Sequence, residues 1–97
     1  MPTFILSLDW TDQGIRGVKE APKRRQAAKE LAKKLGVEVK QAYLTSGEHD
    51  LLLIVESASG DNVTKFALAV GAQGNVRTTT VRAWTESEFE KLLSELP

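Results

Sequence analysis

Hydrophobic residues are concentrated in one short stretch near the middle of the chain. Residues 51–55 are five apolar side chains in succession, and a turn signal at Gly47 precedes them. Such a run, rich in branched side chains, is typical of a central β-strand that is covered on both faces. A chain of 97 residues has few helices, and these can shield only one face of a sheet. The pattern therefore predicts that a second subunit or a ligand covers the other face.

Three further strands are predicted around this run. Residues 3–10 and 37–45 alternate between two sets of side chains, and residues 76–84 contain three successive Thr and two Val, which favour extended backbone. Residues 46–48 are short enough for a tight turn, so the second and third strands should form an antiparallel hairpin.

Helical segments are predicted between these strands and after the last one. Thr11 is the expected N-cap of a short first piece, which Pro22 interrupts. Pro22 also suits the first position of a longer helix that runs to Leu35 and ends at Gly36. Ser59 is a candidate N-cap for the next helix, in which residues 63–70 repeat apolar side chains at helical spacing. The last helix is predicted from a capping box over residues 85–88 and an apolar stripe at Phe89, Leu92, Leu93 and Leu96.

The order of these elements predicts an α+β fold of the ferredoxin-like kind, βαββαβ with an added C-terminal helix, as one domain over residues 1–97. Right-handed crossovers give one antiparallel four-stranded sheet in the order 4-1-3-2, with both main helices on one face. The bare faces of two such sheets would pack together as a dimeric α/β barrel.

The hairpin register and the alternation of the strands predict which side chains share each face. Strict alternation in the second strand places the side chains of Val39 and Tyr43 on the same face of the sheet. The helix-facing set is Phe4, Leu6, Leu8, Ala42, Leu44, Leu51, Leu53, Val55, Val81 and Ala83. The opposite set is Ile5, Ser7, Asp9, Tyr43, Thr45, Asp50, Leu52, Ile54, Thr78, Thr80, Arg82 and Trp84.

Large apolar residues in the second set point to self-association. Leaving one of these side chains exposed loses the roughly 1.5–3 kcal/mol of free energy that its burial would give. The sum of these losses is similar to the whole stability of a small domain, ~5–15 kcal/mol. We therefore predict a homodimer or higher homo-oligomer. The expected interface residues are Ile5, Tyr43, Leu52, Ile54 and Trp84.

Composition restricts the other partners. Thirteen basic and thirteen acidic residues cancel, so no net charge favours nucleic acid or an anionic membrane. The chain has no Cys, and one His alone cannot make a closed zinc site. The N-terminal residues reach Asp9 without a basic region, which indicates a strand and not a signal peptide. We expect a cytoplasmic protein with no metal, cofactor, nucleic-acid or membrane partner.

Five groups of residues together resemble the GYD-domain family, over nearly the whole chain. They are WTDQGI at 10–15, PKR at 22–24, YLT at 43–45, GEHD at 47–50 and GNVRT at 74–78. Gly47 and Asp50 match the Gly and Asp of the family name, whereas His49 stands where the family has Tyr. Because of this departure, any role of the Tyr hydroxyl in the family has no counterpart at this position of the chain. The resemblance implies a ferredoxin-like fold related to dimeric α/β barrels, and it implies no established reaction.

Candidate chemistry gathers at one edge of the predicted sheet. Asp9, Thr45, His49, Asp50 and Arg77 should meet there. The two carboxylates and the imidazole suit general acid–base chemistry, and the carboxylates also suit a hard cation. The alternative is structural: both Asp residues would cap turns, and His49 would be a polar residue at the start of a strand.

A cationic run marks the start of the second helix. Lys23, Arg24 and Arg25 lie where positive charge opposes the helix dipole, so a bound phosphate or carboxylate would relieve the conflict. A solvated face is the more usual role of such a run.

The leading hypothesis is a homo-oligomeric small-molecule-binding or sensor module, with its pocket between the open sheet face and the partner subunit. A small anionic or carbonyl compound is the expected ligand. The predicted pocket residues are Tyr43, Thr45, Asp50, Leu52, Thr80 and Arg82. Two alternatives remain: a cofactor-independent isomerase or oxygenase of a small carbonyl compound that uses Asp9, His49 and Asp50, and a purely structural assembly module.

Overall fold

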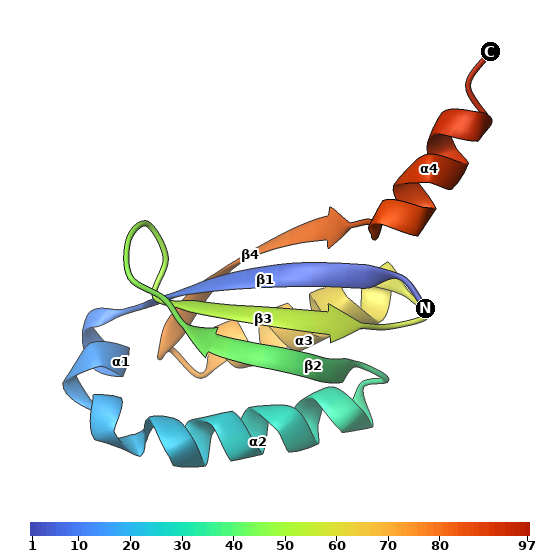
Figure 1. The fold of residues 1–97 in the computed structure, drawn as a ribbon. Helices are drawn as coiled ribbons and strands as arrows, with labels where there is room; N and C mark the ends of the chain where they lie inside the picture. Colours follow the sequence, from blue (N-terminus) through green and yellow to red (C-terminus); the bar gives the residue numbers. More distant parts are fainter.

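A computed structural model describes all 97 residues and contains one four-stranded sheet with helices beside it (Figure 1). Each strand and helix falls close to its predicted position. The elements are β1 (Thr3–Trp10), α1 (Asp12–Arg16), the 3-10 turn η1 (Val18–Glu20), α2 (Ala21–Lys34), β2 (Glu38–Leu44), β3 (Leu51–Glu56), α3 (Gly60–Ala72), β4 (Val76–Ala83) and α4 (Glu86–Ser94).

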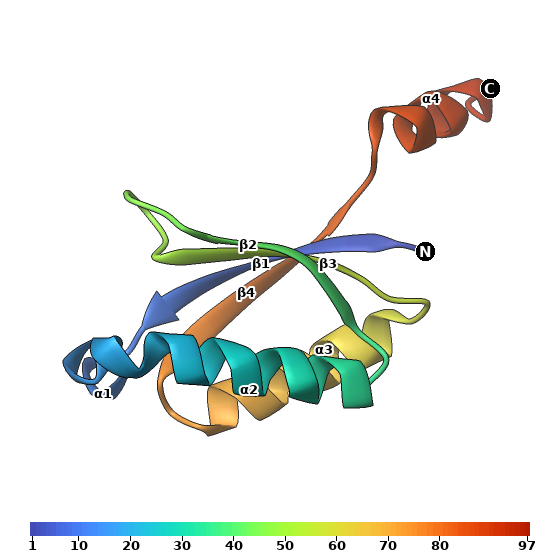
Figure 2. The same cartoon turned by 60° about the horizontal axis from the view of Figure 1, so that its bottom comes forward.

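All strand pairs in the sheet are antiparallel, in the order β2-β3-β1-β4. This is the order 4-1-3-2 read from the opposite edge. Helices α2 and α3 both lie on one side of the sheet, while α4 extends beyond it on the other side (Figure 2). The α+β, ferredoxin-like class with one open antiparallel sheet is therefore confirmed.

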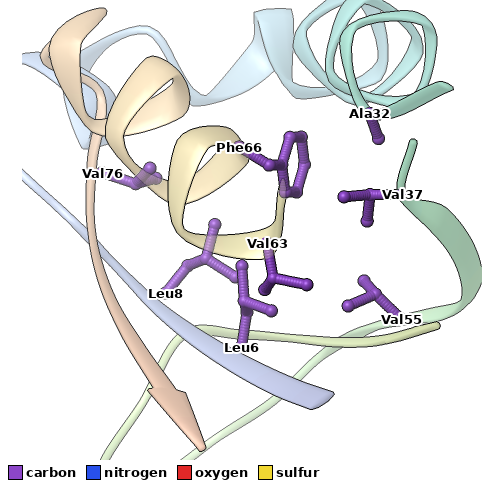
Figure 3. Close-up of a cluster of buried hydrophobic side chains, with 8 residues drawn as sticks. All are labelled: Leu6, Leu8, Ala32, Val37, Val55, Val63, Phe66 and Val76. Carbon is purple, nitrogen blue, oxygen red and sulfur yellow. The ribbon is translucent and has the colours of Figure 1, made fainter. Parts of the chain in front are cut away.

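The hydrophobic core lies between the sheet and these two helices (Figure 3). Alternate residues of β1 point into it, because successive side chains of a strand face opposite sides. Leu6 meets Val63 and Phe66 of α3, which are fully buried. The complete buried cluster is Leu6, Leu8, Ala32, Val37, Val55, Val63, Phe66 and Val76.

Side-chain caps begin three of the helices where the sequence indicates them. The hydroxyl of Thr11 accepts from the Gly14 N–H at 3.1 Å, and Ser59 accepts from the Asp61 N–H at 3.1 Å. Thr85 begins α4 with the predicted capping box. Gly14 itself sits so close to the loop before β4 that an added Cβ would overlap the carbonyl of Asn75.

The predicted faces are correct for β1 and β3 and wrong for β4. Leu6, which is buried under the helices, pairs with Thr80, and Phe4 pairs with Arg82. Thr80 and Arg82 therefore lie on the helix side, while Val81 lies on the opposite one. The error arose because β4 is an edge strand, and its apolar residues need not face the helices. We call the surface away from α2 and α3 the open face; it carries Ile5, Ser7, Asp9, Gln41, Tyr43, Leu52, Ile54, Arg77, Thr79, Val81 and Ala83.

A β-bulge interrupts the alternation that was predicted for β2. Val39 pairs with Val55 and Gln41 with Ile54, so the bulge places one extra residue, Lys40, between them. The prediction that Val39 shares a face with Tyr43 is therefore wrong. Beyond the bulge the predicted pairing is confirmed, since Ala42 lies opposite Leu53, Tyr43 opposite Leu52 and Leu44 opposite Leu51.

Candidate functional site

Apolar side chains form the middle of the open face. The register places Ile5 of β1 between Ile54 of β3 and Val81 of β4, and it pairs Tyr43 with Leu52. Tyr43 and Val81 remain 48% and 51% exposed in the single chain. Four residues of the expected interface therefore share one surface. The fifth, Trp84, follows the end of β4 and stacks at 4.5 Å on the Arg82 guanidinium.

An aspartate–histidine pair lies at one end of the open face. The Nδ1 atom of His49, in the hairpin loop, is 3.2 Å from both carboxylate oxygens of Asp9, at the end of β1. With its proton on Nδ1, the imidazole donates to this carboxylate and keeps Nε2 as an acceptor. The two side chains are 32% and 45% exposed, so a ligand can reach them.

A cation and a hydroxyl complete this group. Arg77 of β4 is the register partner of Asp9 on the open face, but its guanidinium donates to the Val76 carbonyl at 3.5 Å and forms no ion pair with Asp9. Thr45 donates its hydroxyl proton to the carbonyl of His49 at 2.7 Å, which fixes the hairpin loop. We call Asp9, His49 and Arg77 the edge cluster. Its oxygens, ring nitrogen and guanidinium can contact both charges of a small zwitterion or the anionic group of an acid.

Asp50 has a structural position. Its Oδ2 accepts from the Trp10 backbone N–H at 3.0 Å, and its own N–H donates to the Leu8 carbonyl at 3.1 Å. These bonds tie the hairpin to β1 where the regular ladder ends. The Asp50 carboxylate therefore joins two distant segments and does not cap its own turn as the structural alternative had it, and the carboxylate that faces the imidazole is that of Asp9.

Two predicted pocket residues lie away from the edge cluster. Arg82 donates to the Thr3 carbonyl at 3.1 Å, and its guanidinium lies 5.6 Å from the Phe4 ring centroid. Thr80 is on the same helix side, opposite Leu6. Arg77 takes the place on the open face that was assigned to Arg82. The pairing of an acidic with a basic residue, Asp9 with Arg77, is the sequence signal that could have set the β4 register.

A second hollow, which the sequence did not predict, lies on the helix side. It has a volume of about 320 Å³ and extends from the first half of α2 to the helix side of the hairpin. Fourteen of its nineteen lining residues are hydrophobic. Its basic members all come from α2. We call it the α2 groove; the residues used below are Val18, Arg24, Arg25, Lys29, Ala42 and Leu44.

Two other kinds of feature are absent from the structure. No three His, Cys, Asp or Glu residues lie close enough together to hold a metal ion. No helix combines the length and apolar character that crossing a membrane requires.

Comparison with solved structures shows the fold. The feast or famine regulatory protein of M. tuberculosis, in complex with L-methionine, superposes with a TM-score of 0.63 at 19% identity, over 88% of this chain and 51% of the other. This chain thus spans about half the length of that regulator. TTHA0845 from Thermus thermophilus gives a TM-score of 0.57 at 21% identity, over 88% of this chain and 95% of the other.

Sequence comparison shows the family. A curated relative from Thermus thermophilus, the glutamine synthetase and cystathionine beta-lyase binding protein, is 32% identical over 84 residues, which is 86% of this chain and 88% of the relative. The GYD domain model matches residues 4–93. The chain therefore belongs to the GYD-domain family.

Proposed function

We propose that this protein is a homo-oligomeric binding module of regulatory type, which holds a small ligand between its open face and a second subunit. The observation that carries the proposal is the continuous apolar surface of the open face beside the edge cluster. The relative and the fold neighbours that are named for binding or regulation support this class.

Self-association follows from the cost of exposing the open face. Ile5, Leu52 and Ile54 are half-buried and Val81 is half-exposed in the single chain, so covering each would contribute a part of the roughly 1.5–3 kcal/mol that full burial of such a side chain gives. A second open face, packed at the ~10 Å spacing of stacked sheets, provides an apolar cover of the same shape. The pairing would form the dimeric α/β barrel, with its polar edge clusters beside an apolar interior.

The edge cluster suggests the ligand class. Arg77 can form a bidentate contact with a carboxylate, while Asp9 can accept from an ammonium group and Leu52 can contact an apolar side chain. An amino acid carries all three groups. The fold neighbour in complex with L-methionine makes amino acids the first compounds to test.

Titration calorimetry with the twenty amino acids, L-methionine first, tests this ligand class. Replacing Arg77 with Ala should weaken binding about 10- to 100-fold, the usual effect of losing a hydrogen bond to a charged group. The control Lys65→Ala lies on α3, on the helix side, and should change nothing. Absence of binding in the panel, or equal affinity in Arg77→Ala, would reject the amino-acid site.

Binding to another protein is a second candidate function. The relative whose alignment covers 86% of this chain is named for two enzymes that it binds. We test it by passing glutamine synthetase and cystathionine beta-lyase over the immobilised chain, with and without the amino acids. Retention of either enzyme would place this chain in the same class as its relative. Passage of both enzymes without retention excludes them as partners.

The Asp9–His49 pair keeps acid–base catalysis as a further candidate. An imidazole held through Nδ1 by a carboxylate can accept a proton at Nε2. In D2O, such a base would exchange the proton beside the carbonyl of a small ketone or aldehyde for deuterium. Proton NMR would show this exchange, and His49→Gln should abolish it. A chain that exchanges no such proton is not an enzyme of this type.

A further inference from the structure

The C-terminal helix presents an apolar stripe without a partner in its own chain. Helix α4 extends away from the rest of the molecule (Figures 1 and 2). An isolated helix of nine residues is marginal in water, because its stability normally comes from packing an amphipathic face. The apolar side chains of the stripe remain 45–65% exposed; they are Phe89, Leu92 and Leu93 of the helix and Leu96 just after its end.

The α2 groove has the opposite deficiency, an apolar surface without a helix on it. Leu44 and Ala42 of β2 point to the helix side, yet Leu44 is 74% exposed, because this end of the hairpin curves away from α2 (Figure 2). Val18, at the mouth of the groove, is exposed as well. The groove and the stripe are thus two places where large apolar side chains lack cover, and Leu68 of α3 is a third exposed position.

The charges around the two features are complementary. At about 100° per residue, the acidic residues of α4 flank the apolar stripe on both sides, while Lys91 lies at the back of the helix. The groove is bordered by cations from α2, Arg24, Arg25 and Lys29. The chain as a whole has no net charge, so this separation of charge between two helices is local. The four flanking acids are Glu86, Glu88, Glu90 and Glu95.

Helix α4 cannot fill the groove of its own chain. Val76 lines the groove, whereas α4 is connected to the other end of β4, at Ala83. At ~3.3 Å per residue, β4 separates these points by about 23 Å. The helix itself is about 14 Å long, and it lies on the opposite side of the sheet (Figure 2). An α4 helix in this groove would therefore have to come from another chain.

We propose that α4 of one chain docks in the α2 groove of a second copy. Its apolar stripe would cover Leu44 and the groove wall, and its glutamates would face Arg25 and Lys29. Two copies that exchange α4 reciprocally form a closed assembly. The inference rests on the self-association proposed above, and α4 projects past the sheet of its own chain toward solvent (Figure 2).

Site-directed cross-linking of the full chain tests this docking, because the natural sequence has no Cys. Leu93→Cys puts a thiol on the stripe and Leu44→Cys puts one in the groove; both residues are exposed, so neither change disturbs the core. The two variants are mixed under mild oxidation, with one chain carrying a mass tag. Disulfides need Cβ atoms about 4 Å apart, so only docked pairs should react quickly.

We expect at least about tenfold more mixed disulfide from Leu93→Cys with Leu44→Cys than from the control Lys91→Cys with Leu44→Cys. Charge reversal provides a second readout. Arg25→Glu and Glu90→Lys should each lower the yield, and their combination should restore it. Equal yields from position 93 and position 91, or a disulfide that forms only inside a doubly substituted chain, would overturn the proposal.

The remaining outcomes separate the two proposals. If Val81→Asp on the open face leaves both the dimer and the disulfide between positions 93 and 44 unchanged, the face-to-face pairing fails and the docking of α4 stands. If the dimer persists without that disulfide, the docking fails alone. A small amphipathic acid found in the groove by native mass spectrometry, with α4 free, would also reject the docking.

Discussion

At the scale of single residues, two glycines differ in the space that is available for a side chain. Gly14 is buried against the Asn75 carbonyl, where α1 meets the loop before β4. Gly71, in the last turn of α3, has no atom within 4 Å of the place where a Cβ would lie. Only Gly14 is therefore required by packing.

Alanine at these two positions should change stability in opposite directions. Gly71→Ala should raise the free energy of unfolding by about 0.5–1 kcal/mol, because Ala loses less conformational freedom in a helix. Gly14→Ala should lower it by about 1–3 kcal/mol, because the backbone has to move to accommodate the methyl group. Urea unfolding of both variants checks the prediction, and a stabilising Gly14→Ala would contradict the described contact.

At the scale of elements, the sequence predicts starts and ends better than faces. The caps at Thr11, Ser59 and Thr85 depend on local chemistry, so the residues alone reveal them. The face of β4 depends on its register with β1, which is a long-range pairing. The bulge at Lys40 similarly depends on the pairing of β2 with β3. The edge cluster was predicted as a group, but the bond from Asp50 to the Trp10 backbone required the structure.

Helix α4 should lose stability in acid. The Thr85 backbone N–H, donating to Glu88 at 2.8 Å, lowers the pKa of that carboxyl below its usual range. A lowered pKa in the folded state stabilises the cap above the unfolded pKa of about 4.3, and this stability is lost as pH falls through the folded pKa. Amide NMR signals of α4 should report fraying of the helix as the pH falls from roughly 5 to 3, a window around the usual Glu pKa.

The matched variant for this test is Glu88→Gln, which keeps the hydrogen-bonding side chain without the charge. Its α4 signals should vary less with pH than those of the natural chain. Equal pH dependence in both proteins would show that another group controls the end of the helix.

At the scale of the whole molecule, one sheet has helices on one face and apolar residues exposed on the other. A 97-residue chain does not supply a second layer for the open face, and α4 extends past it instead of covering it. Both features are explained if the functional unit contains at least two chains. The ligand site and the docking of α4 would then depend on residues from two copies.

Sedimentation equilibrium at micromolar concentration tests this claim most directly. We predict that the natural chain sediments at twice its 10.7 kDa mass or at a higher multiple. Val81→Asp, which puts a charge beside Ile5 on the open face without touching the core, should shift it toward single chains by at least about tenfold in the dissociation constant. A natural chain that sediments as a single 10.7 kDa species under these conditions would contradict the account.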